Sequence, residues 1–98
     1  MVSHVNSPSA SISVTTSSAR TAYPASNNAN GVCVYNTGSV PIFIKSGDAT
    51  VVATTSDNFV PAGQFRVLVR DPKDTHLAAI TASSTATAYF NNESPWKL

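Results

Sequence analysis

Between residues 31 and 90, short apolar runs alternate with clusters of small polar residues, and this pattern constrains the fold more than any other feature of the sequence. The runs are rich in valine, isoleucine and aromatic residues, which favour strands, whereas the Gly, Asn, Asp and Ser residues between them favour turns. In residues 32–44, two such runs flank the turn residues 36–39, which is the pattern of a hairpin. About six short strands, and no stretch with helical periodicity, predict an all-β fold: a small antiparallel β-sandwich.

The alternation also predicts which side chains are buried. Val32 and Val34 lie on one face of the first expected strand, and Cys33 and Tyr35 lie on the other, so this strand should be central in its sheet. The strands expected over residues 76–82 and 85–90 form a final hairpin. Its candidate buried positions are Leu77, Ala79, Ile80, Ala86, Ala88 and Phe90. Because half of these positions are alanine, the core is thin, and self-association as a dimer or trimer would supply further burial.

Residues 1–30 differ in composition from the rest of the chain. They are rich in Ser, Thr, Asn and Ala and cannot bury enough apolar area to order themselves. Within them, Ile12 and Val14 alternate with serines, as in a half-buried strand. We therefore expect an extended N-terminal arm over residues 1–30, docked either on the edge of its own sheet or on a neighbouring subunit. The β-sandwich domain then spans residues 31–90, and a C-terminal tail spans residues 91–98.

The charge of the chain is low and balanced. Charged residues make up 11% of the 98 residues, and the formal net charge is +1. Such a chain has no strong field that would attract nucleic acid or an anionic membrane, so neither is an expected partner. No run approaches the roughly 20 apolar residues of a membrane-spanning helix. Small uncharged polar side chains are easily desolvated, which suits a surface that packs against other proteins.

No motif in the sequence indicates catalysis. Cys33 is the single cysteine, so neither an intrachain disulfide nor a cysteine zinc cluster can form. Asp71, Asp74 and His76 are close enough in sequence to share a metal ion, but Asp71 and the proline after it fit a type I turn, and we expect a solvated turn there. A nucleophile elbow and a Gly-rich phosphate loop are both missing. We therefore expect no enzyme activity, no metal and no cofactor.

Five side chains are candidates for binding a protein partner. Ile12 and Val14 are apolar positions of the arm, and Trp96 is the lone indole of the tail, where it either folds back on its own domain or fills a pocket on a neighbour. Arg66 and Arg70 lie on one face of a single expected strand. The planar guanidinium suits contacts with acidic side chains of a partner, and an ordinary solvated sheet face is the alternative.

A longer pattern is the run VYNTGSVPIFI of residues 34–44, followed by Gly47-Asp48, by the Pro-Ala-Gly of residues 61–63, and by residues 75–82 and 85–90. This pattern resembles a group of small proteins from tailed bacteriophages, often encoded beside head genes. The resemblance covers about residues 31–90 and carries no catalytic residue. It implies a jelly-roll-like β-sandwich in the virion, for which capsid cement and decoration proteins are the best precedent.

Together these observations predict a structural virion protein that binds the outer surface of a phage head as a cement or decoration protein. Its partner would be the major capsid protein, and it would be a homo-oligomer, assembled in the host cytoplasm and located on the capsid surface. Two alternatives stay open: a spacer or adaptor in the neck, tail or baseplate, and a carbohydrate-binding adhesin module. Exposed coplanar rings among Tyr23, Tyr35, Tyr89 and Trp96 would favour the adhesin.

Overall fold

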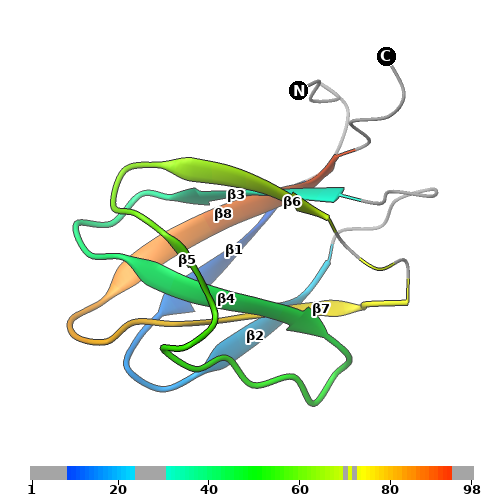
Figure 1. The fold of residues 1–98 in the computed structure, drawn as a ribbon, viewed down its shortest axis with the longest axis horizontal. Helices are drawn as coiled ribbons and strands as arrows, with labels where there is room; N and C mark the ends of the chain where they lie inside the picture. The colour runs from blue at the N-terminus through cyan, green and yellow to red at the C-terminus, as the bar shows by residue number, and fades with distance from the viewer. Residues whose placement is uncertain (1–8, 24–30, 70, 72, 94–98) are drawn as a thin grey trace.

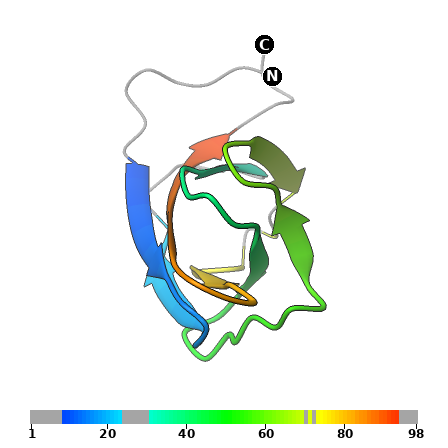
Figure 2. The ribbon, with the colours of Figure 1, turned by 90° about the vertical axis from the view of Figure 1, so that its left-hand side faces the viewer.

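The computed structural model describes residues 9–23, 31–69, 71 and 73–93, and all regular secondary structure in these residues is β-strand. Figure 1 shows the strands, which are β1 (Ser9–Val14), β2 (Ala19–Ala22), β3 (Gly31–Asn36), β4 (Ile42–Gly47), β5 (Asn58–Val60), β6 (Phe65–Val69), β7 (His76–Ile80) and β8 (Ala86–Glu93). They form two four-stranded antiparallel sheets that face each other, as the end-on view in Figure 2 shows. The predicted all-β antiparallel sandwich is confirmed.

The order of the strands makes this sandwich a jelly roll. Sheet A has the order β1-β8-β3-β6, and sheet B has the order β2-β7-β4-β5. The chain passes to the opposite sheet at nearly every connection, and only β4 and β5 are consecutive strands that pair within one sheet. Eight antiparallel strands wound across two sheets in this way are the jelly-roll arrangement.

The two predicted hairpins are wrong, because the turns within them carry the chain across the sandwich. β3 pairs with β6 and β8 in sheet A, whereas β4 pairs with β5 and β7 in sheet B. In the same way, β7 belongs to sheet B and β8 to sheet A. The turn residues signal a reversal of the chain, but they do not specify whether the second strand stays in the sheet of the first.

A buried asparagine holds the crossing between β3 and β4. The Asn36 side chain is fully buried, and its amide nitrogen donates to the carbonyl oxygens of Val40 at 2.8 Å and Val60 at 3.1 Å. Its Oδ1 accepts a hydrogen bond from the Gly38 N–H at 2.9 Å. One side chain thereby ties the end of β3 to the turn and to β5 of the opposite sheet. Glycine is required in this turn, since a Cβ on Gly38 would lie 2.5 Å from the Cβ of Ala86.

The strands β1 and β2 belong to the two sheets, so the sandwich includes residues 9–23 as well as the region expected to form it. β1 pairs with β8, which places Ile12 opposite Ala88 and Val14 opposite Ala86. Ile12 is 4% exposed and Val14 is fully buried. Of the two docking sites that the sequence left open, β1 occupies the edge of its own sheet. The prediction that Ile12 and Val14 bind a partner is wrong, because both side chains fill the core of their own domain.

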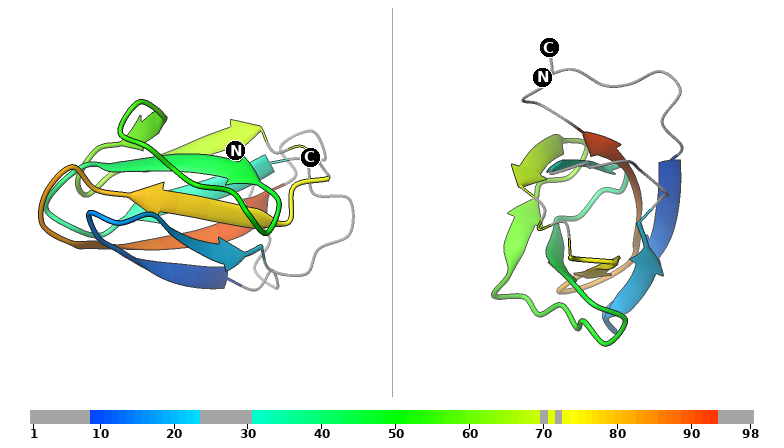
Figure 3. Two further views of the ribbon diagram at one scale, coloured as in Figure 1. Left: turned by 90° about the horizontal axis from the view of Figure 1, so that it is seen from below. Right: turned by 90° about the vertical axis from the view of Figure 1, so that its right-hand side faces the viewer.

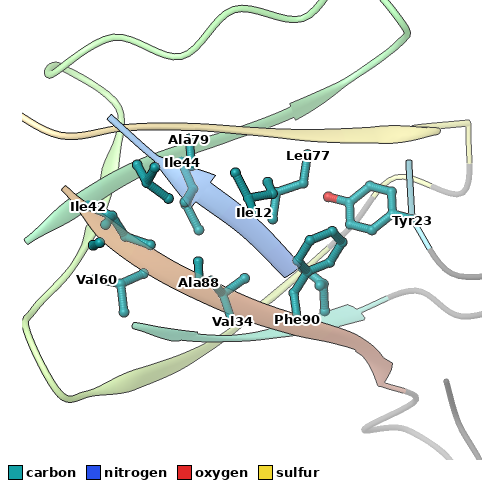
Figure 4. Packing of buried hydrophobic residues seen from close by; sticks show 13 residues of the cluster. Ile12, Tyr23, Val34, Ile42, Ile44, Val60, Leu77, Ala79, Ala88 and Phe90 are labelled. Atoms are coloured by element: carbon teal, nitrogen blue, oxygen red, sulfur yellow. The ribbon is translucent and has the colours of Figure 1, made fainter. Parts of the chain in front are cut away.

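The core lies between the two sheets and receives side chains from both (Figure 4). The ring of Phe90 meets the ring of Tyr23 edge to face, with centroids 5.7 Å apart and planes at 86°. Of the buried positions predicted in the last two strands, Ile80 is only partly buried. The positions confirmed as buried are Leu77, Ala79, Ala86, Ala88 and Phe90.

The loop of residues 48–57 covers part of the outer face of sheet B. It crosses β4 and β7 in the view from below (Figure 3, left). Val51 and Ala53 of this loop are buried against Ala78, with Ile80 partly buried beside them. The Ala53 N–H also donates to Ser18 Oγ at 2.9 Å. Sheet B therefore carries a second, small apolar cluster on its outer side.

Candidate functional site

The residues considered as metal ligands lie in the turn before β7 and at the first position of β7. Asp71 Oδ1 accepts a hydrogen bond from the Lys73 N–H at 2.9 Å, and the Asp74 N–H donates to the Asp71 carbonyl oxygen at 2.8 Å. His76 Nδ1 lies 2.8 Å from Thr75 Oγ1. Among the described residues, no three His, Cys, Asp or Glu side chains gather where they could hold a metal ion. The described part of the chain also has no helix of the length and hydrophobicity that crossing a membrane requires.

A cleft of about 280 Å³ opens between the ends of the two sheets. A chain of two hydrogen bonds runs beside the cleft. Ser46 Oγ donates its hydrogen to Asp74 Oδ2 at 2.7 Å. Because a serine hydroxyl has only one hydrogen to donate, the Tyr23 hydroxyl, 2.6 Å away, is the donor of the bond to Ser46 Oγ. This chain links the residue after β2 to β4 and to the turn before β7. The lining residues are Tyr23, Val32, Ile44, Lys45, Ser46, Asp57, Asn58, Leu68, Val69 and Leu77.

The remaining predicted partner-binding residues lie near or beyond the edge of the described structure. Arg70 and Trp96 fall outside the described residues. Arg66 is exposed, and its Nη1 donates to the Phe59 carbonyl oxygen at 3.0 Å, which links the β6 edge of sheet A to the β5 edge of sheet B. An open groove follows these two edges and is lined by Phe59, Pro61, Gln64, Phe65 and Arg66.

The outer face of sheet A carries exposed apolar side chains. Side chains alternate along a strand, so the odd-numbered side chains of residues 11–13, 33–35, 65–69 and 87–91 point away from the core. The ten side chains named below are uncharged, and Val69 is 77% exposed. What we call the sheet A face consists of Ser11, Ser13, Cys33, Tyr35, Phe65, Val67, Val69, Thr87, Tyr89 and Asn91.

Three rings lie side by side on the sheet A face, in register across three neighbouring strands. Tyr89 of β8 is opposite Tyr35 of β3, and Tyr35 is opposite Phe65 of β6. Their exposed fractions are 49%, 45% and 50%. Because neighbouring strands are about 4.8 Å apart, these residues, here called the aromatic row, span about 10 Å. Ser11 of β1 continues the row beyond Tyr89.

Sequence reasoning located two members of the aromatic row only as conditional candidates and did not locate Phe65 at all. In β6, Leu68 packs against the core, whereas Phe65, Val67 and Val69 point away from it. An apolar alternation normally indicates a buried face, and here that face is turned outward. The sequence does contain a signal for the direction of Tyr89. Adjacent residues of a strand point to opposite faces, so a buried Phe90 places the ring of Tyr89 on the outer face.

Comparisons with protein-family models, with curated proteins and with solved structures give no match for this chain. A functional assignment therefore depends on what the geometry of its surface can bind. In the described structure, the surface best suited to binding is the sheet A face, where rigid rings stand on a hydrogen-bonded sheet.

Proposed function

We propose that this chain is a structural virion protein, a capsid cement or decoration protein that binds the outer surface of a phage head through the sheet A face. The observation that carries the proposal is the aromatic row among the ten uncharged side chains of the sheet A face. Aromatic side chains are enriched at protein interfaces, and charged side chains are depleted from interface centres. The jelly-roll order of the strands supports the same setting, since viral capsid domains are among the proteins with this fold.

The proposed mechanism is the burial of the aromatic row against the major capsid protein. Tyr35 supplies the central anchor, because Tyr89 and Phe65 lie on its two sides and Cys33 lies next along the strand on the same face. The neighbouring Ser and Thr side chains are uncharged and form a rim that is easily desolvated. Many identical copies on one shell then act together, so each site contributes to capsid stability even when its own affinity is modest.

Binding to purified heads tests the proposal. Heads of the phage that encodes the chain are mixed with purified wild type, with Tyr35→Ala, and with a variant in which all three rings of the aromatic row are replaced by Ala, and the bound fraction is measured by co-sedimentation. We expect Tyr35→Ala to weaken binding by about 10-fold to 30-fold, the effect of losing an interfacial anchor of about 1.4–2 kcal/mol. Val52→Ala is the matched control, because Val52 is 55% exposed and lies in the loop over sheet B.

Two results would overturn the proposal. One is a triple variant that binds heads as tightly as the wild type while its melting temperature is unchanged. The other is the absence of the chain from purified particles in mass spectrometry. The copy number per particle separates a shell protein from the neck, tail or baseplate alternative, since a shell binds many copies and those structures bind few.

A carbohydrate-binding adhesin is the second candidate, and the aromatic row is the observation that favours it. Of the rings named for that alternative, Tyr35 and Tyr89 are exposed and adjacent, Tyr23 is buried, and Trp96 lies outside the described residues. Aromatic rings flanked by hydroxyl groups are typical of small-ligand surfaces. A glycan array probed with the wild type and with Tyr35→Ala distinguishes this candidate, and an array without binding would count against it.

A further inference from the structure

We propose that the free edge of β6 is a self-association surface, through which two copies of this chain join their sheets A into one continuous antiparallel sheet. This inference concerns the isolated protein and does not depend on the proposed capsid binding. In the described part of the chain, β6 pairs with β3 alone and forms the rim of sheet A (Figure 1). An unpaired strand edge presents backbone donors and acceptors that a strand of another molecule can use.

The register of β3 and β6 shows which backbone groups point to that edge. The Asn36 N–H donates to the Gln64 carbonyl oxygen at 2.9 Å, so this residue pair is a hydrogen-bonded pair of the antiparallel ladder. Hydrogen-bonded pairs recur at every second residue, and the residues between them direct their N–H and C=O groups to the other side of the strand. The backbone groups of Phe65, Val67 and Val69 therefore point away from β3, toward the free edge.

Of the four strands at sheet edges, β6 combines the length and the outward apolar side chains that pairing with a second copy needs. β2 has four residues and β5 has three, which leaves little length for a new ladder. β1 has six residues and contains neither lysine nor proline, but its outward side chains Ser11 and Ser13 are polar, so pairing there would cover no apolar side chain on the outer face. β6 has five residues and contains neither lysine nor proline, which commonly protect edge strands. Its only charged residue, Arg66, is bonded to the Phe59 carbonyl oxygen of sheet B.

A two-fold axis beside Val67 gives the register of the dimer. Val67 then pairs with Val67 of the second copy, and Phe65 pairs with Val69 of the second copy on both sides of the axis. A shift in one direction would place Arg66 opposite the same arginine of the second copy, and opposed like charges destabilise a sheet. A shift in the other direction would leave only residues 67–69 paired. The favoured register is thus self-complementary, as a two-fold interface requires.

This pairing also covers side chains that one copy leaves exposed. Val69 is 77% exposed and Phe65 is 50% exposed, and each would meet the other across the new strand pair. On the inner side, Arg66 would lie opposite Leu68 of the second copy, where no like charge faces it. The two aromatic rows would then lie on the same side of one continuous sheet.

The test is the molar mass of the purified full chain, measured by size-exclusion chromatography with light scattering over a range of concentrations. We expect wild type at high concentration to have twice the 10.2 kDa mass of one chain. Val67→Pro removes the N–H directed at the second copy and leaves the β3–β6 hydrogen bonds intact. Val67→Lys brings two ammonium groups together at the axis. For both variants, the dissociation constant of the dimer should be at least 10-fold higher than for wild type. The control Val52→Lys should have the dissociation constant of wild type.

Charge complementation tests the axis itself. Val67→Lys and Val67→Glu are each expected to be monomers, and an equimolar mixture is expected to form a dimer, because the axis places position 67 of one copy opposite position 67 of the other. Recovery of the dimer also shows that both variants are folded. The proposal is overturned by a wild type that stays monomeric up to about 1 mM, the weak end of specific association. It is equally overturned by a dimer that survives in Val67→Pro and Val67→Lys, or by a mixture that stays monomeric.

Discussion

Replacing Ile12 with alanine should destabilise the whole domain. Ile12 is 4% exposed and lies in the cluster between the sheets, opposite Ala88 of β8. Truncation of a buried isoleucine to alanine costs about 2–5 kcal/mol, of which the larger values apply where neighbours cannot fill the cavity. The neighbour directly across the strand pair is a methyl group, so we expect about 3–5 kcal/mol. A domain of this length has a total stability of only about 5–15 kcal/mol.

Thermal unfolding followed by circular dichroism measures this loss. A domain of this size loses about 4–8 °C of melting temperature per kcal/mol, so Ile12→Ala should melt at least about 12 °C below the wild type. Ile12→Val removes one methyl group and should cost about 0.5–1.5 kcal/mol, which gives a graded series at one position. Ser13→Ala is the matched control on the same strand, because Ser13 is exposed and its change should stay within about 0.5 kcal/mol.

The reasoning would be refuted if Ile12→Ala melted within about 2 °C of the wild type, since that shift corresponds to about 0.5 kcal/mol or less. Such a result would mean that β1 is not held in sheet A in solution. Ile12 would then be available to a partner, as the sequence by itself suggests. A normal melting temperature combined with weaker binding to purified heads would identify that partner as the capsid.

Three further predictions concern turns. Asn36→Ala removes the amide that satisfies two carbonyl oxygens and one N–H, and should cost about 3 kcal/mol or more in urea unfolding; a loss below about 1 kcal/mol would contradict its role. Gly38→Ala should cost about 1–3 kcal/mol through its clash with β8. The control Gly63→Ala, in open space at φ +70°, should cost only about 1 kcal/mol of backbone strain, and an equal loss in both would argue against the clash. Hydrogen bonds from the Thr50 hydroxyl and then its N–H hold the pKa of Asp48 below its ordinary value of 3.8, so the stabilisation is present at neutral pH and lost as the pH falls through the lowered pKa. Asp48→Asn should make unfolding less steeply acid-dependent, and an unchanged pH profile would count against this contribution.

The sequence predicts the strands of this fold better than their pairing. The two apolar runs predicted within residues 32–44 lie in strands β3 and β4, and β3 is central in its sheet as the apolar character of both its faces indicates. Their connection looks like a hairpin because Asn, Gly and Ser favour any tight reversal. In the structure, the Asn36 amide donates to the Val60 carbonyl oxygen, 24 positions away in the chain, and this bond ties the end of β3 to the opposite sheet. A long-range bond of this kind leaves no local signature.

In the serine-rich segment, by contrast, a local pattern predicts a strand that the composition argues against. Composition indicates that residues 1–30 cannot order themselves, and in isolation this is sound reasoning. The alternation of Ile12 and Val14 with serines is the stronger signal, because it matches a strand with one buried face, and β8 provides the partner for that strand. The candidate site was harder to predict for the same reason, since Tyr35 and Phe65 become neighbours only when β3 and β6 pair.

The two proposals concern adjoining parts of one surface, and their order of assembly follows from the residues they use. The β6 edge uses Phe65 and Val69, whose apolar surface is costly to leave in water, and it needs only a second copy of the same chain. Tyr35 and Tyr89 lie one and two strands further in and stay exposed in such a dimer. Under the two proposals we therefore expect dimerisation to come first and to present two aromatic rows on one continuous sheet. A head that offers two matching sites would bind this dimer more tightly than a single copy, because the second contact is made within the complex.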